Sequence, residues 1–186
     1  TGVLPVRRRK PIEVLICEPQ LVTYGFPYLP VMWGVLKTYW EGHAPHPEMV
    51  RWHDPIHEML EPERLVASSV DQPLDVVGLS CYTWNWRLQL RVAQLLREAH
   101  PDCLIVAGGP HPDYRDPGFF EQHPWIDAVV VKDGEVPFTQ ILRRVLAHKN
   151  TRELRSNPDA LRDVGGLCLP GMGGQLTGPT EVPERY

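Results

Sequence analysis

The sequence has no excess of basic residues. Its 186 residues include 19 Lys and Arg against 23 Asp and Glu, which gives a formal net charge of −4 at pH 7. A protein that follows a nucleic acid must neutralise a series of phosphates with basic side chains. The composition therefore argues against nucleic-acid binding. The one basic run, at residues 7–10, stands in an expected amino-terminal tail, residues 1–11, and is typical of a solvated segment.

Long apolar runs are also missing. No stretch approaches the roughly 20 apolar residues that a membrane-spanning helix requires, so no membrane partner is expected. Cysteine is scarce, and Cys17, Cys81, Cys103 and Cys168 are far apart in the sequence. Three of them fall in or beside strand-like runs, where Cys usually acts as a small buried hydrophobe. A reducing, cytoplasmic location is predicted.

Several motifs of catalysis and of nucleotide binding are absent. There is no Gly-x-Ser-x-Gly, no Walker-type loop and no Gly-x-Gly-x-x-Gly after the first expected strand, which argues against a hydrolase, an NTPase and a dinucleotide binder. The third strand ends in Ser80, where a receiver domain would have a phosphate-accepting Asp. His43 with His46 and His53 with His57 lack Cys or carboxylate partners at zinc-like spacing. We therefore expect neither catalytic residues nor a metal site in this chain.

Short β-branched runs alternate with helical patterns along the chain. We expect strands at residues 12–17, 49–52, 75–80, 103–107 and 128–131. We expect helices at residues 31–40, 62–69 and 86–99, a one-turn helix that Asp116 caps and that ends before Pro124, and a last helix from about Val136. The strands lack polar alternation, which is typical of strands covered on both faces. The pattern predicts a doubly wound α/β domain over residues 12–150, with a five-stranded parallel sheet.

The pattern changes from about Asn150. Two short runs, residues 165–169 and 175–177, flank a glycine-rich turn and predict a small carboxyl-terminal β-hairpin. Residues 179–186 are typical of a linker. Residues 151–186 are therefore expected to form a hairpin and a linker toward a further domain.

Small and polar residues follow the expected strands. In doubly wound sheets, ligands bind beyond the carboxyl ends of the strands. The candidate binding residues are therefore Glu18, Pro19, Gln20, Ser80, Tyr82, Thr83, Trp84, Asn85, Gly108, Gly109, Pro110, His111, Asp133, Gly134 and Glu135.

Each of these groups also has a structural interpretation. Gly108 and Gly109 would let a flat or phosphorylated group approach the backbone, but they could instead form a tight turn. Ser80 or Asn85 could cap the next helix. The aromatic residues at 82–86 are typical of a site for a large apolar ligand or of a docking surface, although one of the two tryptophans is expected to pack under the loop.

Three segments in this order, residues 78–85, 106–112 and 130–138, resemble the amino-terminal cobalamin-binding domain of radical S-adenosylmethionine enzymes. The similarity covers roughly residues 12–178. The resemblance implies that Ser80, Gly108 and Gly109 line the groove for the nucleotide tail of cobalamin. It also implies that the loop from Glu18 onward faces the lower side of the corrin.

Two departures refine this resemblance. Cobalamin domains with a lower histidine ligand carry Asp-x-His-x-x-Gly after the first strand, whereas residues 18–23 of this chain contain no histidine. This favours the radical enzymes, which commonly lack that histidine, over carriers like methionine synthase. The chain also lacks Cys-x-x-x-Cys-x-x-Cys. The 4Fe–4S cluster and the S-adenosylmethionine that the resemblance implies would therefore be bound elsewhere in the parent protein, in a covalently linked radical domain.

The leading hypothesis is a cobalamin-holding domain of a radical enzyme, with a C-methyltransferase of natural-product or peptide modification ranked first. One alternative is a stand-alone corrinoid carrier or sensor, which a stop codon rather than a cysteine triplet after Tyr186 would indicate. Another is a flavodoxin-like domain that binds a flavin, which the absorption spectrum of the loaded protein would identify.

Overall fold

The computed structural model describes residues 10–23, 26–27 and 29–182, and the described residues alternate between strands and helices. The basic residues 7–9 and residues 183–186 of the expected linker lie outside this part of the chain. The strands are β1 (Ile12–Cys17), β2 (Val22–Thr23), β3 (Phe26–Pro27), β4 (Val50–Trp52), β5 (Val76–Ser80), β6 (Leu104–Gly108), β7 (Ala128–Val130) and β8 (Leu167–Cys168). The helices are α1 (Val31–His43), α2 (Pro62–Ala67), α3 (Trp86–Ala99), α4 (Phe119–Gln122), α5 (Glu135–Ala147) and α6 (Thr151–Ser156), with 3-10 turns η1 (Pro47–Met49) and η2 (Pro158–Leu161).

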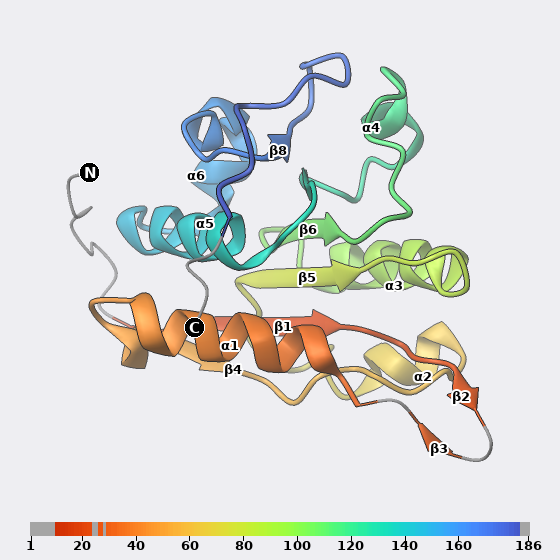
Figure 1. The fold of residues 1–186 in the computed structure, drawn as a ribbon. Coiled ribbons are helices and arrows are strands. Elements are labelled where there is room, and N and C mark those ends of the chain that lie inside the picture. The colour runs from red at the N-terminus through yellow and green to blue at the C-terminus, as the bar shows by residue number, and fades with distance from the viewer. Residues whose placement is uncertain (1–9, 24–25, 28, 183–186) are drawn as a thin grey trace.

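The main sheet has the strand order β4-β1-β5-β6-β7-β8. The first five of these strands are parallel, and β8 is antiparallel to β7. The arrows of β1, β5 and β6 point the same way in Figure 1, so their carboxyl ends meet at one edge. The chain passes from β1 outward to β4 and then back to β5, and this reversal of winding marks the usual ligand position in such sheets. The predicted doubly wound fold with five parallel strands is confirmed.

Both faces of the sheet are buried, because helices cover each of them. All six residues of β1 are buried. Alternate residues of a strand point to opposite faces, so Val14 and Ile16 pack with α1 and α5, whereas Leu15 and Cys17 pack with α2 and α3. This arrangement explains why the strands show no polar alternation. No helix in the described part of the chain is both long enough and apolar enough to cross a membrane.

Two local structures were not predicted from the sequence. The strands β2 and β3 pair antiparallel within the loop that follows β1. The helix α6 and the turn η2 occupy a segment that was expected to be irregular. The sequence contained a signal for the start of α6, namely Asn150 followed by Glu153. In the structure, the side chain of Asn150 caps α6 by accepting a hydrogen bond from the backbone N–H of Glu153 at 3.1 Å. An Asn three residues before a Glu is a typical helix start.

The ends of two predicted elements are shifted in the structure. The helix α4 begins at Phe119 after Gly118, and Asp116 instead accepts a hydrogen bond from the backbone N–H of Gly118 at 2.8 Å. In the carboxyl-terminal extension, the strand Leu167–Cys168 pairs with β7. The expected second arm is not a strand, since Thr177 meets Leu167 partly through its side chain, with the Leu167 N–H donating to Thr177 Oγ1 at 3.0 Å.

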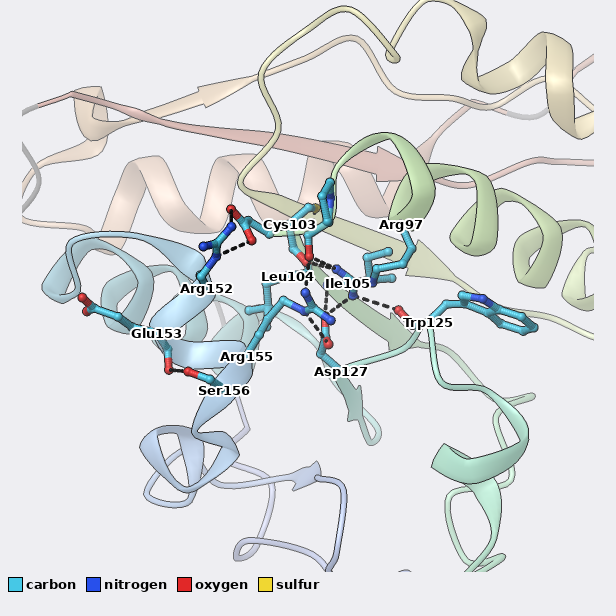
Figure 2. A network of polar contacts seen from close by, with 12 residues as sticks. Arg97, Cys103, Leu104, Ile105, Trp125, Asp127, Arg152, Glu153, Arg155 and Ser156 are labelled. Carbon is cyan, nitrogen blue, oxygen red and sulfur yellow. Dashed lines mark hydrogen bonds and ion pairs between the residues drawn. The ribbon is translucent and has the colours of Figure 1, made fainter.

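A nearly buried carboxylate joins several elements at the amino edge of the sheet (Figure 2). One oxygen of Asp127 accepts hydrogen bonds from Arg97 Nη2 at 2.6 Å and from the N–H of Ile105 at 2.8 Å. The other oxygen accepts from Arg155 Nε at 3.0 Å. Arg97 belongs to α3 and Arg155 to α6, so Asp127 links a helix on one face of the sheet to the carboxyl-terminal extension.

We expect the substitution Asp127→Ala to lower the free energy of unfolding by about 3 kcal/mol, because it leaves two poorly exposed guanidinium groups without their carboxylate. Urea denaturation of the purified chain measures this change. The matched control is Asp102→Ala. It removes the exposed ion-pair partner of Arg152, which lies on α6 like Arg155, and should lower the free energy of unfolding much less. Equal effects of the two substitutions would contradict the importance of the buried contact.

Candidate cofactor-binding site

A pocket of about 620 Å³ opens at the carboxyl edge of the sheet. It lies on the face that α1 and α5 cover, and the ends of four parallel strands line it, through Ile16, Ser80, Gly108 and Val130. Most of the lining side chains are apolar, with a few polar groups at the strand ends. An apolar pocket with few convergent polar groups is typical of a small-molecule or cofactor site.

The strand register places two predicted binding residues side by side. Ser80 of β5 pairs with Gly108 of β6 at the last position of both strands. A Cβ atom at Gly108 would meet nothing closer than Val130, at 3.9 Å. The absence of a side chain at Gly108 therefore leaves open space in the pocket wall, which a ligand can use.

Gly109 has a different role, which is to hold two loops together. Its φ of 92° lies in the left-handed region, and a Cβ atom there would stand 2.4 Å from the carbonyl oxygen of Cys81. This close approach lets the Cys81 N–H donate to the Gly108 carbonyl at 2.8 Å. A side chain at Gly109 would disturb the loop itself, so Gly108 is the cleaner position for testing the pocket.

A further glycine, Gly78 of β5, shapes the floor of the pocket. A Cβ atom at Gly78 would lie 2.7 Å from Ile16 Cδ1 and 3.4 Å from Phe138 Cε2. The missing side chain lets Ile16 and Phe138 pack closely against the strand. This part of the pocket lining is therefore apolar.

The loop after β7 forms the side of the pocket next to α5. Lys132 has a φ of 68°, which is uncommon for a residue other than glycine. Asp133, Gly134 and Glu135 follow it and also line the pocket. Glu135 stands in the first turn of α5, where the helix dipole favours a negative charge.

Glu18, directly after β1, stabilises the start of α1. Its buried carboxylate accepts hydrogen bonds from the N–H groups of Met32 at 2.9 Å and Trp33 at 3.4 Å, and from Gln20 Nε2 at 2.8 Å. The cap residue of α1, Pro30, supplies no side-chain hydrogen bond, so Glu18 satisfies these donors from 14 residues away. Burial raises the pKa of the Glu18 carboxyl, while the N–H donors oppose that rise.

Asn85 and Gln89 are fully buried on one face of α3. Asn85 Oδ1 accepts from the N–H of Tyr82 at 2.8 Å, and Asn85 Nδ2 donates to the carbonyls of Ser80 at 2.9 Å and Pro19 at 3.1 Å. Gln89 Nε2 donates to the carbonyls of Cys17 at 2.7 Å and Ser80 at 3.1 Å. The two amides thus fix the loops after β1 and β5 relative to each other.

The aromatic residues of the loop after β5 divide into two environments. Tyr82 and Trp84 stack with their ring centroids 4.5 Å apart, and Trp84 is 45% exposed. Trp86 instead packs under the loop against His111 and Phe119. The expectation that one of the two tryptophans packs under the loop is confirmed.

The structure brings about half of the predicted site residues into the pocket lining. These are Ser80, Tyr82, Gly108, Gly109, Pro110, Asp133, Gly134 and Glu135. The others, Glu18, Pro19, Gln20, Thr83, Trp84, Asn85 and His111, do not line it, and their contact with a ligand stays a prediction. The sequence analysis missed lining residues from the covering helices and from the loop after β6, namely Met32, Val35, Leu36, Tyr114, Arg115 and Phe138.

Comparison with known proteins identifies the class of this domain. Residues 52–142 match the family model of the B12 binding domain. Residues 52–142 thus match a B12 binding domain, and the predicted cofactor, cobalamin, agrees with this match.

Its relatives define the type more closely. The chain is 39% identical over 117 residues to the cobalamin-dependent radical SAM methyltransferase TokK of Streptomyces tokunonensis, a match of 63% of this chain and 17% of that protein. It is 39% identical over 160 residues to the 2-(S-pantetheinyl)-carbapenam-3-carboxylate methyltransferase of Streptantibioticus cattleyicolor, with 86% and 22% covered. The chain thus spans about a fifth of the length of these relatives.

Solved structures show the same fold. The cobalamin-dependent S-adenosylmethionine radical enzyme OxsB, with aqua-cobalamin and S-adenosylmethionine bound, matches with a TM-score of 0.68 and 17% identity, over 94% of this chain and 23% of that chain. The predicted resemblance to the cobalamin-binding domain of radical SAM enzymes is therefore confirmed.

The contacts of Asn85 lead to a stability prediction. The substitution Asn85→Ala removes three hydrogen bonds and leaves the Tyr82 N–H and the buried Pro19 carbonyl without these partners, while the Ser80 carbonyl keeps Gln89. We expect it to lower the free energy of unfolding by about 2 to 3 kcal/mol, which urea denaturation measures. We also expect faster hydrogen exchange at the Tyr82 amide. Thr83→Ala, an exposed neighbour in the same loop, is the control, and equal stability of the two variants would refute the proposed bracing role.

Proposed function

We propose that this chain holds cobalamin for a larger radical S-adenosylmethionine enzyme whose reaction is the transfer of a methyl group to carbon in a natural product or peptide. The observation that carries the proposal is the apolar pocket of about 620 Å³ at the carboxyl ends of the parallel strands. The match to the B12 binding domain and the two methyltransferase relatives support it. They favour it over a stand-alone carrier or a flavin-binding domain.

The residues of the pocket fit this cofactor. The wall at Gly108 is open, because a Cβ atom there would find no contact closer than 3.9 Å. Ser80 beside it offers a hydroxyl group to the ligand. We propose that Ser80, Gly108 and Gly109 lie along the nucleotide tail, and that the loop from Glu18 to Gln20 faces the lower side of the corrin. The other predicted residues, Thr83, Trp84 and His111, would then contact parts of the cofactor outside the pocket.

The work of this chain is binding and orientation. Cobalamin, when bound, supplies a cobalt centre that can carry a methyl group. Residues 18–23 contain no histidine, so we propose that this loop would offer no imidazole ligand to the cofactor. The 4Fe–4S cluster and S-adenosylmethionine would belong to a covalently linked radical domain, since the chain contains no cysteine triplet and spans about a fifth of its relatives.

We propose that residues 12–150 form the cobalamin-binding domain and residues 151–186 its connection to the radical domain. We further propose that the protein works in the reducing cytoplasm, apart from membranes and nucleic acids. The four cysteines support this location, because all of them are buried and none forms a disulfide.

The first test is retention of the cofactor. The purified chain is mixed with hydroxocobalamin, separated from excess by gel filtration, and examined by its visible spectrum and its ratio of cobalt to protein. We expect near-stoichiometric retention, because residues of this chain line a pocket of about 620 Å³. Retention of a flavin instead of the corrinoid would overturn the proposal.

A pair of glycine variants tests the position of the site. Gly108→Leu places a side chain in the open pocket wall and should lower corrinoid retention at least tenfold, with little change in stability. The control Gly42→Leu adds the same side chain on the exposed face of α1, where a Cβ atom meets nothing within 4 Å. Equal retention by both variants would show that the site lies elsewhere.

A further inference from the structure

Two basic side chains line the pocket and have no acidic partner among the residues that the structure describes. Arg115 follows β6 and Lys132 follows β7, and both are exposed. The ion pairs among the described residues include neither of them. Arg115 instead lies over the ring of Tyr114, with its Cζ atom 5.2 Å from the ring centroid. Two unpaired cations thus stand at the edge of a mostly apolar pocket.

The acids of the same pocket do not neutralise these cations. Asp133 and Glu135 line the pocket, but neither comes within ion-pair distance of Arg115 or Lys132 in the described structure. They stand just before and within the first turn of α5, where the positive end of the helix dipole stabilises a carboxylate. The two cations are therefore available to a negative charge on a ligand.

The carboxyl-terminal extension braces the backbone at both cations. A Cβ atom at Gly174 would lie 2.7 Å from the Arg115 carbonyl oxygen, so the extension packs directly against Arg115. Before Lys132, the Val131 N–H donates to the Gly166 carbonyl at 2.9 Å, and Thr180 Oγ1 donates to the Val131 carbonyl at 3.0 Å. These contacts hold Lys132 in its left-handed conformation, which is strained for a residue with a side chain.

We propose that Arg115 and Lys132 together bind the phosphodiester of the nucleotide loop of the corrinoid. This inference rests on the proposed function, because it assumes a corrinoid in the pocket. The side chains around a corrin ring are neutral amides, and the phosphodiester is the one anion at the periphery of cobalamin. It is therefore the group of the ligand that complements two cations, and charge-assisted contacts to phosphate are strong and directional. Residues 165–180 act as the brace that sets the positions of the two cations.

The test compares cobalamin with cobinamide, a corrinoid that lacks the nucleotide loop and its phosphate. Binding of each corrinoid to the 186-residue chain is measured by calorimetry for the wild type and for Lys132→Met and Arg115→Gln. We expect each substitution to weaken cobalamin binding about tenfold and to leave cobinamide binding unchanged. Higher ionic strength should weaken cobalamin binding by the wild type more than by either variant.

Two controls accompany these variants. Lys149→Met removes an exposed lysine beyond the opposite end of α5 and should leave both affinities unchanged. Lys132→Arg keeps the charge and should retain cobalamin binding. Circular dichroism verifies that each variant is folded.

The outcomes separate this inference from the proposed function. If the wild type binds neither corrinoid, the proposed function fails and the inference fails with it. If the wild type binds cobalamin but the substitutions at Lys132 and Arg115 leave its affinity unchanged, or weaken both corrinoids equally, the phosphate assignment is wrong while the proposed function stands.

Discussion

Two amide side chains on one face of α3 determine how the carboxyl edge of the sheet is built. Parallel strands end there with carbonyl groups that leave the hydrogen-bond ladder while still buried, and such groups need partners. Asn85 and Gln89 supply these partners for Cys17, Pro19 and Ser80. Because the two residues are one helical turn apart, a single rigid element sets the relative positions of the loops after β1 and β5. The part of the pocket wall at Ser80, Tyr82 and Gly108 depends on this alignment.

The amino and carboxyl edges of the sheet, where the strands begin and end, are stabilised by different interactions. Charged groups hold the amino edge, where Asp127 joins α3 and α6 through two arginines. The carboxyl edge is held by the amides of Asn85 and Gln89, by the Glu18 carboxylate that binds N–H groups of α1, and by the close approach of Gly109 to Cys81. The charged network lies away from the site and stabilises the scaffold without competing for the ligand.

The sequence predicted the fold well because the apolar periods are strong. The helix Trp86–Ala99 has the predicted bounds, and the last helix, predicted from about Val136, begins at Glu135. The short helix α6 was missed because its apolar stripe is too brief to show a period, although Asn150 and Glu153 signalled its start.

The site was predicted less completely, for a physical reason. The residues that follow the strands could be located from the chain alone, and Gly108 and Ser80 do meet in the pocket. The side chains of Leu36 and Phe138 could not, since they reach the pocket only because α1 and α5 cover that face of the sheet. Asn85 showed the same limit, because its partner Pro19 is 66 residues away in the sequence.

The short strand β8 forms one lateral border of the sheet, beside β7. Without it, β7 would be an edge strand with unpaired N–H and C=O groups, which is a template for pairing with another molecule. The strand Leu167–Cys168 covers β7 but is itself two residues long, and β4 at the opposite edge has three residues. Neither border of the sheet is long enough to recruit a strand from a second chain. In the folded domain, the extension therefore leaves β7 without an open edge at which another strand could pair.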